Sequence, residues 1–108
     1  MKPYLPEEVQ IPAERQAAFF RVLGNSQRIL ILWFIAERAR TANEIALAIG
    51  ASLASMGHHL RILEFNHLVE IRREHNNVYY YLADNEITRN CLVFKDMPKE
   101  MLIEINLI

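Results

Sequence analysis

Two short stretches of the sequence carry the side chains best suited to chemistry, and that chemistry is hydrogen bonding to a polyanion. The first stretch spans residues 52–61 and holds hydroxyl, imidazole and guanidinium groups on Ser52, Ser55, His58, His59 and Arg61, with Gly57 as a candidate for close backbone approach. The second stretch holds Arg72, Arg73, His75, Asn76 and Asn77. Arginine binds a phosphate or a guanine edge through paired hydrogen bonds, and serine and histidine can donate to either group. The sequence therefore predicts a surface that contacts nucleic acid.

Catalysis and metal binding have little support in the same sequence. There is no glycine-rich phosphate loop, no Gly-x-Ser-x-Gly and no His-Glu-x-x-His, so we do not expect an enzyme. A single cysteine, Cys91, excludes an internal disulfide and any metal site that needs two thiolates from one chain. The four histidines lack a recognised ligand spacing. We therefore expect no metal ion and no cofactor.

The composition is that of one globular domain. The chain has 108 residues, of which 52% are hydrophobic and 23% charged. No apolar run could span a bilayer and no signal peptide is recognisable, so we expect no membrane partner and a cytoplasmic protein. The net charge of −1 is a mild argument against nucleic acid, because phosphate binding usually shows as a basic excess. Any DNA contact must come from a local basic patch.

The first part of the chain predicts an arm and two helices. Pro3, Pro6 and Pro12 favour an extended arm over residues 1–12. A helix is expected over residues 13–23, ending at Gly24. Ser26 is expected to cap the next helix, which runs to about residue 38 and is apolar nearly all round, as is typical of a central core helix.

The middle of the chain predicts two helices joined by a tight turn. Residues 41–44, Thr-Ala-Asn-Glu, have the form of a capping box and open a short helix that ends at Gly50. Ser52 is expected to cap the following helix. Its predicted buried stripe is Met56, Leu60 and Leu63, with Leu53 one turn earlier. Two helices joined in this way form a helix-turn-helix.

A β-hairpin and a last helix follow. Residues 68–73 and 78–82 predict two strands joined by a turn at residues 75–77. Asp84 is expected to cap a helix that runs to about Phe94. The domain boundaries expected are an arm at 1–12, a winged helix-turn-helix domain with dimerisation helices at 13–96, and an apolar tail at 97–108 of undecided conformation.

These segments together resemble the ArsR/SmtB family of winged helix-turn-helix transcriptional repressors. The resemblance covers about residues 19–82 and is carried by residues 22–32, 44–50, 52–63, 68–74 and 78–82. It implies a mainly α (α+β) winged-helix fold, in which the second helix of the motif and the hairpin contact double-stranded DNA. It also implies a homodimer formed by the first and last helices. The expected interface residues are Phe19, Phe20, Leu23, Ile87, Cys91, Leu92 and Phe94.

The sequence departs from the sensor sites of that family. Residues 43–46, in the first helix of the motif, contain no cysteine, where metal sensors of the family often carry a pair. The last predicted helix region offers Asp84, Glu86 and Asp96 but no histidine. Redox-sensing members use two cysteines and this chain has one. The familiar metal sites are therefore expected to be absent.

The resulting prediction is a homodimeric repressor that binds a palindromic site, its two recognition helices about 34 Å apart. Leu53, Ala54 and Gly57 replace polar residues on the DNA side, so we expect weak or shape-driven recognition. Two alternatives stay open: a winged-helix protein-interaction module that has lost DNA binding, and an atypical metal or redox sensor. Whether a small-molecule effector exists is also left open.

Overall fold

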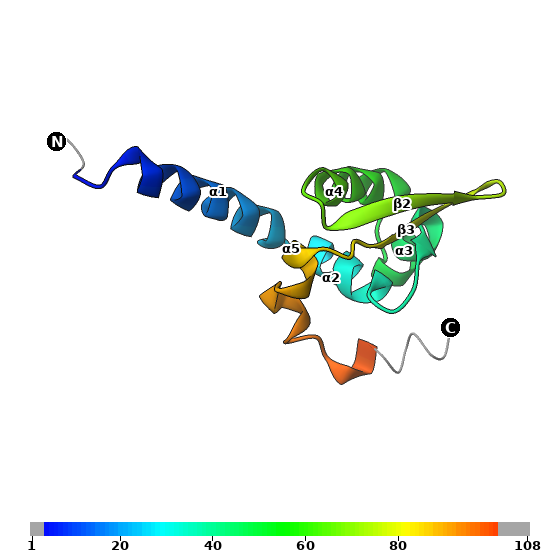
Figure 1. The fold of residues 1–108 in the computed structure, drawn as a ribbon. Helices are drawn as coiled ribbons and strands as arrows, with labels where there is room; N and C mark the ends of the chain where they lie inside the picture. Colours follow the sequence, from blue (N-terminus) through cyan, green and yellow to red (C-terminus); the bar gives the residue numbers. More distant parts are fainter. Residues whose placement is uncertain (1–3, 102–108) are drawn as a thin grey trace.

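The structure, a computed structural model, describes residues 4–101 as a set of helices with one small antiparallel sheet (Figure 1). In chain order the elements are α1 (Glu7–Leu23), α2 (Ser26–Ile35), β1 (Arg40–Thr41), α3 (Ala42–Ile49), α4 (Leu53–Phe65), β2 (Val69–Glu74), β3 (Asn77–Leu82), α5 (Glu86–Arg89) and the 3₁₀ turn η1 (Leu92–Phe94). A helix-turn-helix followed directly by a β-hairpin is the winged-helix arrangement. The expected mainly α fold with a hairpin wing is confirmed.

Helix α2 lies at the centre of the core, and α3 and α4 pack against it. The fully buried apolar side chains of these three helices are Ile31, Leu32, Ile35, Ile45, Met56, Leu60 and Leu63. Each such side chain contributes about 1.5–3 kcal/mol when it leaves water. The buried stripe of α4 therefore fixes the rotation of that helix and turns its opposite side outward.

Leu53 does not continue that stripe, although the spacing predicted that it would. It is 53% exposed. As the first residue of α4 its side chain points back toward the helix N-terminus, beyond the core, and lines a shallow groove beside the wing.

The turn between α3 and α4 is defined by caps at both helices. The Thr41 hydroxyl accepts the Glu44 N–H at 3.2 Å and the Glu44 carboxylate accepts the Thr41 N–H at 3.3 Å, so the capping box is confirmed. Gly50 ends α3 at φ +77°, a left-handed conformation that suits glycine. The Ser52 hydroxyl accepts the Ser55 N–H at 3.1 Å and begins α4.

The wing is the hairpin of β2 and β3, and β1 adds a short third strand in the order β1-β3-β2. Its turn has two residues, His75 and Asn76, within the predicted turn at residues 75–77, and His75 takes a positive φ of +55°. Strand β1 pairs Arg40 with Tyr80 and Thr41 with Tyr79. We did not predict β1, since two residues carry no periodicity and their pairing is distant in sequence.

Helix α1 begins at Glu7, so the expected extended arm is wrong from that residue onward. Pro12 lies inside the helix and removes one backbone hydrogen bond, the one to the carbonyl of Glu8. The helix tolerates this loss because its first turn is acidic and suits the positive end of the helix dipole, and because water reaches the exposed carbonyl.

Helix α2 also differs from the prediction at both ends. The cap is Asn25 and not Ser26, because the Asn25 side-chain oxygen accepts the Arg28 N–H at 3.1 Å. The helix ends at Ile35, three residues earlier than expected. Two adjacent residues were both suitable caps, and the sequence did not distinguish them.

The last helix is much shorter than expected. It is capped by Asn85 and not Asp84, and α5 ends at Arg89. The following residues, Asn90 and Cys91, are weak helix formers, and the chain continues into the 3₁₀ turn η1. A helical turn follows Pro98 at residues 99–101. Residues 102–108 of the expected apolar tail lie outside the described residues.

The molecule is elongated, because α1 projects from the body (Figure 1). The radius of gyration is 16.2 Å, against about 13 Å for a compact chain of this length. Of the α1 side chains, Leu23 is buried and several apolar ones are exposed. A helix that extends this apolar surface into solvent needs a partner to cover it.

Candidate nucleic-acid interface

The outer face of α4 carries most of the polar residues that the sequence predicted for this helix. His58 and Arg61 are exposed, and Ser55 lies half-buried one turn before His58. Ser52 is exposed at the N-terminal cap, where its hydroxyl oxygen is engaged with the Ser55 N–H. His58 and Arg61, three residues apart, lie on the outer side of α4, and Ser55 lies toward the edge of that side. This face can donate hydrogen bonds to phosphates or base edges.

Gly57 leaves a small opening on the same face. A β-carbon at this position would lie 3.6 Å from Nη1 of Arg61, which is ordinary van der Waals contact. The protein's own packing therefore does not require glycine here. Because glycine has no side chain, the helix surface beside the Arg61 guanidinium leaves space for another molecule to approach the backbone closely.

His59 points inward, so its prediction as a DNA-facing residue is wrong. It is 9% exposed, with Nε2 3.1 Å from Oε1 of Gln27 and Nδ1 3.3 Å from Nη1 of Arg28. Burial, then the positive charge of Arg28 and that of His58, lower the pKa of His59 below its ordinary 6.5. The surroundings of His59 therefore favour its neutral imidazole.

The sequence contained a signal for this placement. His59 lies three residues after Met56 and four before Leu63, on the buried stripe of α4. Its partners Gln27 and Arg28 were not identified, because a side-chain contact between α2 and α4 leaves no local pattern.

The two arginines of the wing have different surroundings. Arg72 lies 3.8 Å from the Glu74 carboxylate, and its guanidinium carbon lies 5.7 Å from the Tyr81 ring centroid. The Tyr81 hydroxyl donates to Glu70 at 2.7 Å, and this bond is the main reason that its pKa is raised. Arg73 points to the other side of the strand and makes no ion pair among residues 4–101. Arg73 is therefore more available to an external anion than Arg72.

The tip of the wing approaches the N-terminal ends of α3 and α4. His75, Asn76 and Asn77 are exposed, and the two asparagines line a groove of about 310 Å³. The other residues of this groove are Thr41, Ala42, Asn43, Leu53, Val78 and Tyr80. The groove joins Asn76 and Asn77 of the wing to Leu53 at the start of α4, and none of the polar residues predicted on α4 lines it.

A second, larger groove of about 620 Å³ lies between α1 and the α5–η1 segment. Six of the seven predicted dimer residues line it: Phe19, Phe20, Leu23, Ile87, Cys91 and Leu92. Phe20 and Leu92 are 60% and 64% exposed. The seventh residue, Phe94, instead packs against the protein core. The groove is an apolar surface without a partner in the monomer.

Three further observations bear on other kinds of function. Within residues 4–101, no three His, Cys, Asp or Glu side chains come together in a way that could hold a metal ion. Cys91 is buried with a free thiol. No helix in the same range has the length and apolar character needed to cross a membrane.

Known proteins with similar sequences are transcriptional regulators. The chain is 36% identical over 75 residues to a transcriptional repressor SmtB homologue of Synechocystis sp.. The match covers 69% of this chain and 57% of that repressor, so the chain spans a little over half the length of this curated relative. No protein-family model matches the chain.

Solved structures with similar folds include a winged helix-turn-helix DNA-binding domain. NolR from Sinorhizobium fredii superposes with a TM-score of 0.72 at 28% identity, over 85% of this chain and 90% of that one. The homodimeric winged helix-turn-helix DNA-binding domain of Mb0332 from Mycobacterium bovis gives a TM-score of 0.68 at 26% identity, over 99% and 90%.

Proposed function

Because the chain belongs to the ArsR/SmtB family of winged helix-turn-helix proteins, we propose that it binds double-stranded DNA as a homodimer and represses transcription. The observation that carries the proposal is that the outer side of α4, and the wing that packs beside this helix, both carry exposed basic side chains. His58 and Arg61 on α4 and Arg73 on the wing are free of the core and face outward. In the winged-helix geometry α4 enters the major groove while the wing lies along the flanking backbone.

The dimer is proposed to form through the apolar groove between α1 and α5–η1. Covering this groove would bury Phe20 and Leu92 and would explain why α1 extends from the body. A two-fold axis there would present two α4 helices to one side of the DNA, about 34 Å apart on a palindromic site. The cytoplasm is the compartment that such a regulator requires.

Local charge, and not net charge, would supply the affinity. Arg61 lies on the outer side of α4, and Arg72 and Arg73 lie on opposite sides of strand β2 in the wing, although the net charge of the chain is −1. A dimer would then neutralise roughly six phosphates, which gives a slope of roughly −5 in log K against log salt. Base contacts are few on this face, so recognition should depend largely on DNA shape.

The test is a fluorescence titration of the protein into labelled duplex taken from upstream of its own gene, at low and moderate salt. The full chain should bind with a steep salt dependence, and Arg61→Ala should weaken binding about tenfold, since one lost arginine contact is worth on the order of 1–3 kcal/mol. Arg89→Ala is the matched control, because Arg89 lies on α5 in an ion pair with Asp84. Equal binding by Arg61→Ala and the parent would contradict the placement of α4.

One observation favours a second candidate, a protein-interaction module that has lost DNA binding. Leu53 at the start of α4 and Leu47 on α3 are 53% and 84% exposed, so the helix-turn-helix carries apolar side chains that duplex DNA does not need. The same titration separates the two: absence of binding even at low salt favours the interaction module.

A further inference from the structure

A buried hydrogen-bonded link joins the proposed recognition helix to the α1–α2 junction. In α4, His59 uses both ring nitrogens, Nε2 to Gln27 Oε1 at 3.1 Å and Nδ1 to Arg28 Nη1 at 3.3 Å. A guanidinium can only donate, so Nδ1 must accept. The proton is then on Nε2, which donates to Gln27. This network selects one tautomer of the neutral imidazole.

Arg28 continues the link to the end of α1. Its Nε donates to the Val22 carbonyl at 2.6 Å and its Nη2 donates to the Arg21 carbonyl at 3.3 Å. Both carbonyls belong to the last turn of α1, and that of Arg21 also accepts the Gly24 N–H at 3.3 Å. One arginine of α2 therefore holds α1 and α4 together.

We propose that Arg28 is a positioning residue that couples α1 to the recognition helix through His59, and that protonation of His59 in acid weakens DNA binding. The proposal rests on the proposed function. Helix α1 carries Phe19 and Phe20 of the dimer groove, and α4 carries the DNA-facing residues. The angle between the two helices would set the separation of the two α4 helices in the dimer, and a palindromic site tolerates little change in that separation.

Protonation breaks the link for a stereochemical reason. A proton on Nδ1 would place an N–H against the Arg28 N–H at a nitrogen separation of 3.3 Å, with two positive charges facing each other. The charged or titratable groups that act on His59 are Arg28 from α2 and His58 from α4, and both are basic. No acidic group is among them, so nothing there stabilises the imidazolium.

The direction of the pH effect follows from the lowered pKa of His59. Burial first, then Arg28 and His58, disfavour the charged ring. The unfolded chain, with a histidine pKa near 6.5, binds the proton more readily than the folded one. The stabilisation is therefore complete above pH 6.5 and is lost as the pH falls from there through the lowered pKa.

The test measures DNA affinity between about pH 5.5 and 7.5 for the parent and for His59→Gln, whose side chain does not titrate. The parent should bind about five- to tenfold more weakly at the acid end, as expected when one buried hydrogen bond is lost. His59→Gln should keep its affinity over the same range. Parallel pH profiles for the two proteins would overturn the proposal.

His67→Asn is the control, since it also removes one histidine. His67 is exposed, lies outside the DNA-facing set and has a positive φ that asparagine tolerates. Its pH profile should match that of the parent. A flat profile in this variant would show that the effect does not depend on His59 and would also overturn the proposal.

A second measurement needs neither DNA nor a variant. In an NMR titration of the parent, the His59 ring should titrate below pH 6.5, and the amide signals of Val22 and Leu23 should shift with the same midpoint. If these amides do not follow the ring, the coupling is refuted. Should the parent bind no DNA at pH 7.5 and low salt, the proposed function fails while this titration still decides the coupling.

Discussion

Replacing Phe20 with alanine should weaken the proposed dimer by about three orders of magnitude. Phe20 is 60% exposed on the wall of the α1–α5 groove. An aromatic side chain presents about 200 Å², so roughly 120 Å² awaits a partner. At about 25 cal/mol/Å² its burial contributes about 3 kcal/mol, of which alanine would retain roughly a third. A two-fold dimer contains two copies, so the loss is about 4 kcal/mol, or a factor of about 10³ in Kd.

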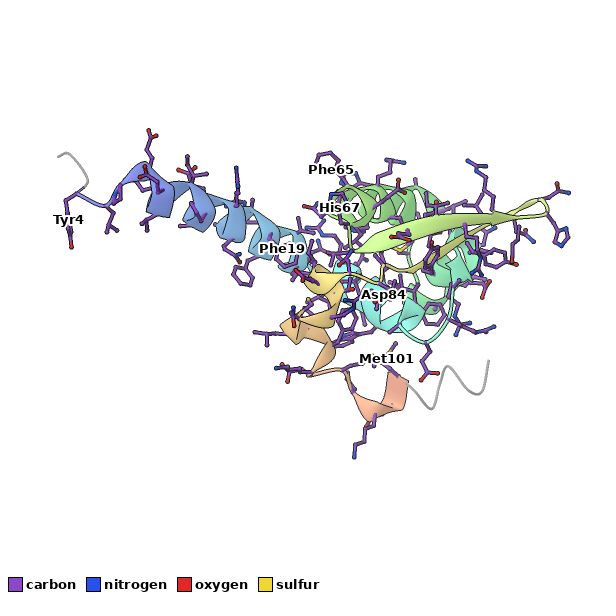
Figure 2. The ribbon with its side chains drawn as sticks, viewed as in Figure 1. Tyr4, Phe19, Phe65, His67, Asp84 and Met101 are labelled. Carbon is purple, nitrogen blue, oxygen red and sulfur yellow. The ribbon has the colours of Figure 1, made fainter. Side chains whose placement is uncertain are left out.

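Sedimentation equilibrium over a range of protein concentrations measures this Kd. The matched control is Phe65→Ala, which removes the same side chain from the end of α4, where Phe65 is 83% exposed and does not line the groove (Figure 2). The control should dimerise as the parent does. If Phe20→Ala retains the parent's Kd, or if Phe65→Ala loses as much, the groove is not the interface.

Three further predictions concern the wing, the core and a helix cap. In a fluorescence titration, Arg73→Ala should weaken DNA binding about tenfold and Arg72→Ala only about twofold, because Arg72 is already engaged by Glu74 and Tyr81. Equal losses would contradict the assignment of Arg73 as the main DNA contact of the wing. Met56→Ala should lower the free energy of unfolding, measured in urea, by about 2–5 kcal/mol, since Met56 is fully buried. A loss below about 1 kcal/mol would refute the placement of Met56 in the core. Thr41→Ala should cost about 1 kcal/mol by removing the capping box, and an unchanged urea midpoint would show that the cap contributes nothing.

The parts of the fold that the sequence predicted are those governed by local rules. The Thr41–Glu44 capping box, the left-handed Gly50 and the Ser52 cap each depend on a few adjacent residues, and all three are present. The stripe of Met56, Leu60 and Leu63 has one helical period and faces the core. Local geometry therefore predicted the helix-turn-helix.

The parts that the sequence did not predict depend on distant partners or on competing neighbours. Strand β1 exists because Arg40 and Thr41 meet Tyr80 and Tyr79, almost forty residues away. Pro12 favoured an arm, yet one lost hydrogen bond did not prevent α1 from forming.

The candidate site was predicted in outline and corrected at one residue. The polar residues of α4 and the wing were identified by type and are exposed, except Ser55, which is half-buried, and His59, which is buried. The spacing of His59 from Met56 and Leu63 places it on the buried stripe of α4. We nevertheless predicted it to be exposed, because the neighbouring serines and arginine are polar. Helical period should outweigh residue type when the two disagree.

The most direct test of the central claim is to map the amide NMR signals of the full-length protein as duplex from upstream of its gene is added at low salt. The largest shifts should fall on residues 52–61, at the cap and along α4, and on residues 72–77 of the wing, and they should become smaller as salt is raised. Shifts confined to the groove between α1 and α5, or none at all, would contradict DNA binding through α4 and the wing.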